Sequence, residues 1–265
     1  MTQLHRPHGI LWIGTALAVA LFAGAAQAAY VITTSGQRID GTDIRAKSDG
    51  EIILTTAQGT RSFYQGQYTR AVADKPAEID QAAKLAEAKK FDEAIKLLED
   101  VAVRYRFLDW DVQARVALPK VYLLKGDAAG AVAAYDKLFT ASPKTKEDAE
   151  VQWSYRQALL GAKQYDRLET VLKDVIAKGS RADAARAQIM RGDVKASQNQ
   201  LEAAALDYMR TVILFSGERA VQPEALMKAA ETFEKLRDAR AKELFRKIVD
   251  DFPTSPQAAA ARAKI

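Results

Sequence analysis

The sequence predicts a mostly α-helical protein in which about five helix-turn-helix units stack into a superhelix, preceded by a small all-β module. Three observations predict this class. Short β-prone runs separated by glycines occupy residues 29–75, the hydrophobic period becomes helical from Pro76 onward, and side-chain sizes recur there every 36 or 37 residues. We therefore expect three parts, an export signal at residues 1–28, the β module at 29–75 and the helical domain at 76–265.

The N-terminal segment has the pattern of a secretory signal peptide. A start with one fixed positive charge, Arg6, precedes 17 uncharged residues from Ile10 to Ala26, and Ala26-Gln27-Ala28 supplies a small-residue cleavage site. This run is shorter than the ~20 apolar residues that a spanning helix needs. We expect cleavage after Ala28, no integral membrane span in the mature chain, and a periplasmic location. Retention of the segment as a membrane anchor is the alternative.

The residue composition excludes most catalytic chemistries. The chain has no Cys, and its two histidines, His5 and His8, lie in the expected signal. Without imidazole or thiol, the remaining residues cannot form a Cys nucleophile, a disulfide framework, a His or Cys zinc site or a Ser-His-Asp triad. Motifs of phosphate loops, nucleophile elbows and dinucleotide sites are absent from the sequence as well. We expect neither an enzyme nor a cofactor or metal site.

The β module is predicted from short runs that end in turn residues. The expected strands are Tyr30 to Thr34, Ile39 to Ala46, Glu51 to Thr55, Arg61 to Tyr64 and Gln67 to Ala71. Between the second and third runs, Asp49-Gly50 suits the positive φ angles of a tight hairpin turn. Four or five short antiparallel strands over about 45 residues predict a meander or a small SH3-like barrel.

The helical domain carries a repeat longer than any single helix. One position recurs at spacings of 37, 37, 36 and 37 residues and is small in all units but the third: Ala94, Ala131, Leu168, Ala204 and Ala241. Four positions later come large side chains: Leu98, Tyr135, Leu172, Tyr208 and Phe245. Medium side chains follow seven positions after the first set. Because offsets of 0, +4 and +7 share one helix face, each set predicts one face of the second helix of a unit.

The second unit resembles a tetratricopeptide repeat (TPR). The family's signature positions are matched by Gly126, Ala131, Tyr135 and Pro143. The resemblance covers about residues 76–265 in five units, although the usual period is ~34 and Pro119 is expected to kink a helix. The ending, with Phe252-Pro253 and a following Ser-x-x-Ala, is similar to repeats in bacterial envelope proteins of the Tol-Pal-associated and outer-membrane assembly type.

The resemblance implies a non-enzymatic scaffold that binds another envelope protein in the groove lined by the first helix of each pair. The family's groove positions carry over onto Val116, Lys120, Leu123, Trp153, Gln157, Leu160, Arg186, Ile189 and Asp193. Trp153 would be either an aromatic anchor for the partner or part of the core. The charged run Arg181, Arg186, Arg191 and Lys195 is better explained as a solvated face than as an anion site.

The β module offers an alternative function, binding of peptidoglycan or another cell-wall polysaccharide. Tyr30, Phe63, Tyr64 and Tyr68 could supply stacking faces, although the same rings would serve the core of a small barrel. A nucleic-acid partner is not expected, because the net charge of +5 is a mild excess without a concentrated basic stripe.

Overall fold

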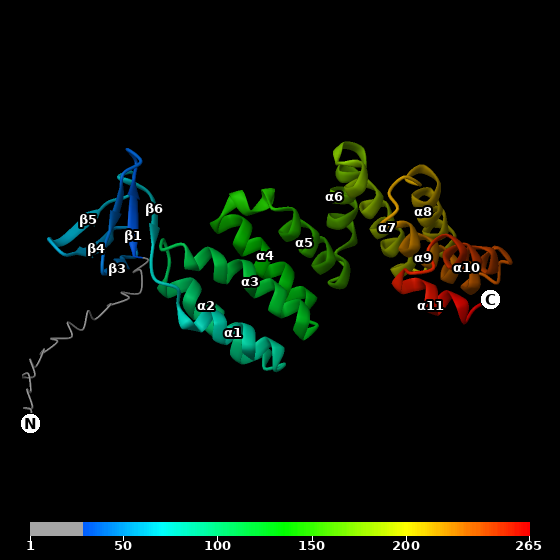
Figure 1. The fold of residues 1–265 in the computed structure, drawn as a ribbon, viewed down its shortest axis with the longest axis horizontal. Helices are drawn as coiled ribbons and strands as arrows, with labels where there is room; N and C mark the ends of the chain where they lie inside the picture. The colour runs from blue at the N-terminus through cyan, green and yellow to red at the C-terminus, as the bar shows by residue number, and fades with distance from the viewer. Residues whose placement is uncertain (1–28) are drawn as a thin grey trace, which may run out of the picture. The chain divides into compact units, whose positions relative to one another are not determined.

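The computed structural model describes residues 29–265, which fall into two compact units (Figure 1). The first unit ends at Asp74 and the second runs from Lys75 to Ile265. The expected export signal, residues 1–28, lies outside the described residues. Among the residues described, none of the helices is long and apolar enough to span a membrane.

The N-terminal unit contains two three-stranded antiparallel sheets, with the strand orders β2-β1-β6 and β3-β4-β5. The strands are β1 (Tyr30–Thr33), β2 (Arg38–Asp40), β3 (Asp43–Ala46), β4 (Ile52–Thr56), β5 (Gly59–Phe63) and β6 (Tyr68–Val72). The first and last strands are neighbours, because β1 pairs with both β2 and β6. The predicted small all-β module is confirmed, with one difference. The single strand expected over residues 39–46 is divided into β2 and β3.

Gly41 explains this division. A Cβ at this position would lie 2.5 Å from the carbonyl oxygen of Thr55, a distance that no side chain tolerates. The Gly41 N–H donates to the Ala29 carbonyl at 2.9 Å, beside the first sheet, and the Thr42 N–H donates to the Thr55 carbonyl at 2.7 Å, in the second. The chain therefore passes from one sheet to the other within two residues, and only glycine lets the backbones come this close.

The β unit buries side chains from both sheets. The core includes, at most 7% exposed, Val31, Ile44, Ile52, Leu54, Phe63 and Ala71. The predicted turn at Asp49-Gly50 joins β3 to β4. Gly50 has a φ of 88°, and a carboxylate oxygen of Asp49 accepts a hydrogen bond of 3.0 Å from the Glu51 N–H.

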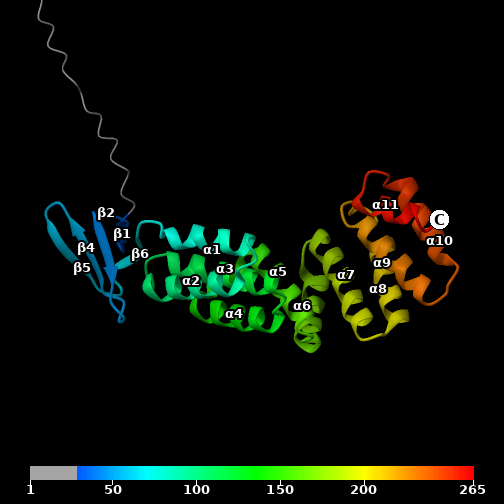
Figure 2. The same cartoon turned by 90° about the horizontal axis from the view of Figure 1, so that it is seen from below.

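The C-terminal unit is a stack of helix pairs (Figure 2). Within residues 75–265 the pairs are α1 (Ala77–Glu87) and α2 (Phe91–Arg104), α3 (Trp110–Lys125) and α4 (Ala128–Ala141), α5 (Ala149–Gly161) and α6 (Tyr165–Lys178), α7 (Arg181–Ser197) and α8 (Leu201–Leu214), and α9 (Gln222–Lys235) and α10 (Arg240–Asp251). A short helix, α11 (Pro256–Arg262), follows the last pair. The predicted mostly α class with about five helix pairs is confirmed.

The repeated positions form the buried face of the second helix in each pair. The side chains of the first set are at most 6% exposed, at Ala94, Ala131, Leu168, Ala204 and Ala241. Those of the second set are at most 3% exposed, at Leu98, Tyr135, Leu172, Tyr208 and Phe245. The third pair thus buries a leucine completely where the other pairs bury an alanine.

The same turn connects the two helices of every pair. One residue in the left-handed region follows each first helix, with φ between 57° and 86°, namely Lys89, Gly126, Lys163, Asn199 and Arg237. Its N–H donates to the carbonyl three residues back, and the next N–H donates to the carbonyl five residues back, in all five turns. These two bonds define the Schellman motif, which favours glycine. Four of the five turns form it without glycine.

Two prolines of the second repeat have distinct places. The helix α3 continues through Pro119, whose ring is buried, so the expected disturbance does not end the helix. Pro143 begins a 3-10 helix, η1 (Pro143–Glu147), which connects α4 to α5. The carboxylate of Asp148 then accepts from the N–H groups of Glu150 and Val151 and caps α5.

Candidate partner-binding surface

The predicted partner-binding residues lie on α3, α5 and α7, which are the first helices of three successive pairs. Their side chains differ in exposure. Gln157 and Arg186 are exposed, and Lys120 is half-exposed. Trp153 and Ile189 are 8% and 2% exposed, so both side chains belong to the packing between helices. Ile189 has no free surface to offer a partner, which does not fit the role predicted for it.

The predicted aliphatic strip is partly core. Val116, Leu123 and Leu160 are half-buried and pack against the large hydrophobic cluster that α3 to α7 share. These residues therefore contribute to the packing of the stack.

An ion pair closes the junction between α3 and α5. The Nζ atom of Lys120 donates to Oε1 of Glu150 at 2.6 Å, and the two side chains are 41% and 74% exposed. A surface pair of this kind contributes at most ~1 kcal/mol to stability. Its consequence here is that the charge of Lys120 already has a partner.

A second ion pair closes the junction between α7 and α9. Oδ1 of Asp193 accepts from the Tyr208 hydroxyl at 2.8 Å and from Nζ of Lys228 at 2.7 Å. Burial, together with the charge of Asp193, raises the pKa of Tyr208, so its hydroxyl keeps its proton and remains a donor. Asp193, at 20% side-chain exposure, is thus held by two donors of the protein itself.

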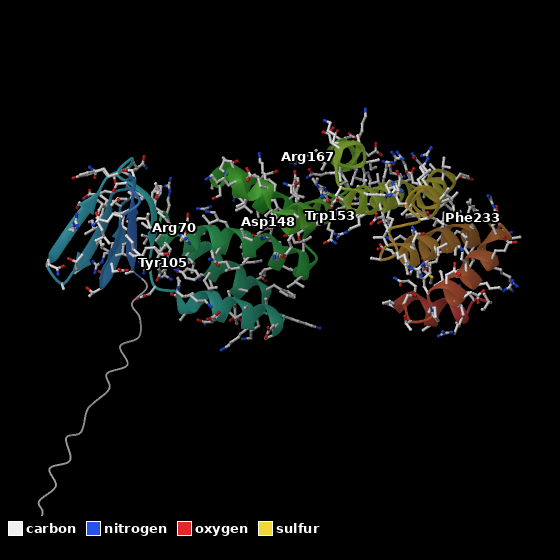
Figure 3. All side chains as sticks on the ribbon, turned by 45° about the horizontal axis from the view of Figure 1, so that its top comes forward. Arg70, Tyr105, Asp148, Trp153, Arg167 and Phe233 are labelled. Atoms are coloured by element: carbon white, nitrogen blue, oxygen red, sulfur yellow. The ribbon has the colours of Figure 1, made fainter. Side chains whose placement is uncertain are left out.

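The junction between α5 and α7 is built around Trp153 (Figure 3). The indole Nε1 atom lies 3.4 Å from Oδ1 of Asp183 on α7. The guanidinium carbon of Arg156 lies 4.6 Å from the centre of the Trp153 ring, and that of Arg186 lies 4.1 Å from it. Each contact of this type contributes about 0.5–2 kcal/mol, depending on how far the cation is desolvated. One indole therefore holds two arginines, from two helices.

Arg156 is buried without an anionic partner. Its side chain is 8% exposed, its Nε atom has no hydrogen-bond acceptor, and it forms no ion pair with any residue that the structure describes. Burial lowers the pKa of Arg156, the charge of Asp183 opposes this effect, and the charge of Arg186 adds to it. The guanidinium nevertheless keeps its proton, because arginine is always charged in proteins.

Asp183 is the acid whose charge acts on Arg156, and local hydrogen bonds occupy it. The Ser180 hydroxyl donates to Oδ2 of Asp183 at 2.6 Å, and the Asp183 N–H donates to the Ser180 hydroxyl oxygen at 3.1 Å, which forms a cap at the start of α7. The bond from Ser180 is the main cause that lowers the pKa of Asp183. Two cations and one carboxylate therefore meet at Trp153, with a net positive charge.

The sequence did not single out Arg156. It lies three residues after Trp153 on a predicted groove helix, but its burial depends on α7, about 30 residues later, and no local pattern reports it. The interpretation of the α7 charges as a solvated face was wrong for two of its members. Arg191 and Lys195 are 28% and 25% exposed and pair with Asp207 and Glu169, respectively.

The aromatic residues of the β unit do not form one stacking surface. Phe63 is 6% exposed and belongs to the core, and the Tyr68 hydroxyl donates to the Gly50 carbonyl at 2.8 Å. The guanidinium carbon of Arg38 lies 3.8 Å from the ring centre of Tyr30, whereas Tyr64 is 57% exposed. The four rings considered for polysaccharide binding are thus divided between core and surface.

Candidate metal ligands do not gather in the part of the chain that the structure describes. Over residues 29–265, no three or more His, Asp or Glu side chains are grouped so that they could hold a metal ion. The chemistry that the α5–α7 junction offers is charge and hydrogen-bond donation, from two guanidinium groups beside an aromatic ring.

Comparisons with known proteins support the repeat and the fold. Residues 224–255, which include most of α9 and all of α10, match the tetratricopeptide repeat family. A crystal structure from Podosopora anserina, described as a putative kinesin light chain with nearly identical TPR-like repeats, has a TM-score of 0.51 at 18% identity, over 71% of this chain and 94% of that chain. A crystal structure of a single-residue variant of the same protein gives 0.52 at 18% identity, over 68% and 96%.

A further solved structure, YrrB, described as a TPR protein with an unusual peptide-binding site, gives a TM-score of 0.45 at 16% identity, over 70% of this chain and 90% of that chain. None of the curated proteins matches the chain. The likeness to the kinesin light chain repeats agrees with the helix pairs described above, and the predicted TPR-like fold is confirmed.

Proposed function

We propose that this chain is a non-enzymatic scaffold of the bacterial cell envelope that binds a protein partner along α3, α5 and α7. The observation that carries the proposal is the row of first helices, whose exposed and half-exposed residues Lys120, Gln157 and Arg186 come from three successive pairs. In a stack of TPR-like pairs the first helices line a groove, and binding there needs complementary shape and charge and no reactive side chain.

The envelope location rests on the sequence. The uncharged run from Ile10 to Ala26 with its small-residue exit supports export, and the Phe252-Pro253 ending supports a likeness to envelope repeat proteins. Expression in a Gram-negative host, followed by osmotic shock and N-terminal sequencing, tests this part. We expect a chain that begins at Ala29 in the shock fluid. A chain that begins at Met1 in the membrane pellet would overturn the periplasmic assignment.

Site-specific photo-crosslinking tests the binding surface. A photoreactive amino acid in place of Gln157, exposed on α5, should give a discrete covalent adduct in living cells. The matched control places the same amino acid at Lys137, which is exposed on α4, the second helix of the neighbouring pair. An adduct from position 157 and none from 137 supports the proposal. Equal adducts at both positions, or none at 157, would show that the first helices are not the binding surface.

A further inference from the structure

From α3 to α9, the first helices of neighbouring pairs meet at three junctions, α3 with α5, α5 with α7, and α7 with α9. The junctions differ in whether their charged side chains form ion pairs. Lys120 and Glu150 form an ion pair across the first junction, and Asp193 and Lys228 across the third. The middle junction, between α5 and α7, contains Arg156 and Arg186, and neither forms an ion pair with a residue that the structure describes. The middle junction therefore holds cationic donors that the rest of the described chain does not use.

The unpartnered state of Arg156 is costly for the folded protein. Removing a charge from water costs several kcal/mol unless a partner returns the energy, and buried polar groups in native proteins nearly always have an acceptor. The contact with the Trp153 ring returns part of this cost. The buried Nε donor remains without an acceptor, and the terminal nitrogens of Arg156 form no hydrogen bond with a described residue, which leaves them for a ligand from outside the chain.

We propose that Arg156 and Arg186 bind a carboxylate of an acidic peptide segment, with Trp153 as the wall that orders both arginines. This inference rests on the proposed function, because it names the chemistry of the partner at that same surface. A guanidinium that stacks on an aromatic ring keeps its in-plane N–H donors for a carboxylate, which it can bind through two parallel hydrogen bonds. Arg186 is exposed and meets the carboxylate first, and Arg156 completes the site beneath it.

The net charge of the junction attracts an anion. Asp183 lies within the cluster and contributes one negative charge against two positive ones. The remaining positive charge is balanced by a single carboxylate, whose two oxygens match the planar donors of a guanidinium group.

Titration of the full-length chain with hexaglutamate, and with hexaglutamine as the neutral match, tests the site. Binding is followed in nitrogen-15 spectra by the indole N–H of Trp153 and the Nε–H of Arg156, with the Trp110 indole as an internal control. We expect hexaglutamate, and not hexaglutamine, to shift the two junction signals. Sodium acetate should reverse these shifts, and sodium chloride at equal ionic strength should not.

Variants locate the site. Arg156→Met and Arg186→Met should each weaken hexaglutamate binding at least tenfold, whereas Arg246→Met, which removes one exposed positive charge from α10, should leave it within twofold. Arg186 is exposed, so its variant tests the site even if Arg156→Met fails to fold. The inference is overturned by equal binding of hexaglutamine, by unshifted junction signals at millimolar hexaglutamate, by equal reversal with sodium chloride, or by equal weakening in Arg246→Met.

The crosslink at position 157 separates this inference from the proposed function. If Arg156→Met leaves that adduct unchanged, the carboxylate site is wrong while the binding surface stands. If the unaltered chain gives no adduct at position 157, the proposed function is wrong, whatever hexaglutamate does at the junction. Loss of the adduct in both arginine variants, with retention in Arg246→Met, supports both.

Discussion

Helix α7 contributes arginines to two clusters that differ in one group. Toward α8, Arg191 meets the carboxylate of Asp207, which is 4% exposed. Toward α5, Arg186 meets the indole of Trp153, where Arg156 is 8% exposed. The first cluster, which we call the Asp207 cluster, has a buried carboxylate at its centre. The second, the Trp153 cluster, has an aromatic ring there. This fold can therefore enclose a carboxylate among arginines at Asp207, whereas the carboxylate beside Trp153, Asp183, is bonded to Ser180 and leaves the Nε atom of Arg156 without an acceptor.

In the Asp207 cluster, the buried carboxylate accepts several hydrogen bonds. Asp207 accepts from Nε and a terminal nitrogen of Arg191 at 2.9 and 2.7 Å, from Arg210 at 2.8 Å and from the Gln188 amide at 2.9 Å. Burial alone would raise the pKa of Asp207, but the hydrogen bonds and charges of Arg191 and Arg210 outweigh it, and the pKa is lowered. The carboxylate is therefore ionised at neutral pH and stabilises the folded state.

The largest effect on stability is expected when the charge of Asp207 is removed. Asp207→Asn keeps the shape of the side chain, removes its charge and leaves Arg191 poorly paired. We expect a loss of about 2–3 kcal/mol in the free energy of unfolding, measured by urea denaturation. Asp250→Asn, at an exposed position of α10, is the control and should change stability by less than about 0.5 kcal/mol. Similar losses in both variants would mean that the buried cluster is not special.

The pH dependence of stability also tests the contribution of the ionised Asp207. Because the pKa of Asp207 is lower in the folded state than in the unfolded chain, the unfolded state takes up a proton first as the pH falls. The contribution of Asp207 is complete above the ordinary aspartate pKa of ~3.9 and is lost as the pH drops through the lower folded value. Urea midpoints between pH 6 and 3 should fall more steeply for the unaltered chain than for Asp207→Asn. Parallel curves would contradict the coupling.

In the Trp153 cluster, removal of a charge should stabilise the folded state. Arg156→Met replaces a buried unpaired cation by an apolar side chain of similar length, so the desolvation cost disappears. We expect a gain of about 1 kcal/mol in the free energy of unfolding, visible as a higher thermal midpoint. A loss of comparable size would show that Arg156 has a stabilising role in the fold, and would remove the energetic argument for an external anion.

The smallest effect is expected at Arg186. Its side chain is exposed, and the contact to the Trp153 ring is the interaction that fixes it. Arg186→Met should therefore alter the free energy of unfolding by no more than about 0.5–1 kcal/mol. Calorimetric midpoints of this variant and of Arg246→Met give the comparison. A change as large as that in Asp207→Asn would mean that Arg186 belongs to the structural core of the junction.

The sequence predicted the features of the helical unit that helix geometry imposes. A repeat of 36 to 37 residues with small and large side chains four positions apart requires one buried helix face per unit, and Ala131 with Tyr135 occupies that face as expected. Of the five residues at the turns between paired helices, only Gly126 was singled out, as a signature position of the repeat family. Lys89, Lys163 and Arg237 adopt the same left-handed conformation, which their residue type does not reveal.

The candidate site was only partly predictable, because its members are defined by contacts between repeats. Trp153 and Arg186 were assigned to groove positions through the family pattern, yet their mutual contact joins helices about 30 residues apart. Arginine is a residue type usually found at the surface, yet Arg156 is as buried as a core residue. Local periodicity describes one helix at a time, so it does not distinguish an arginine with a partner from one without.

The five turns have a consequence for the tolerance of this chain to change. A left-handed residue with a side chain costs about 1 kcal/mol relative to glycine, and Lys89, Lys163 and Arg237 bear that cost in the native fold. Each of these exposed corners is therefore a place where a single glycine would raise thermal tolerance without touching the first-helix surface. Glycine substitutions at these turns would therefore offset destabilising changes elsewhere in the repeats.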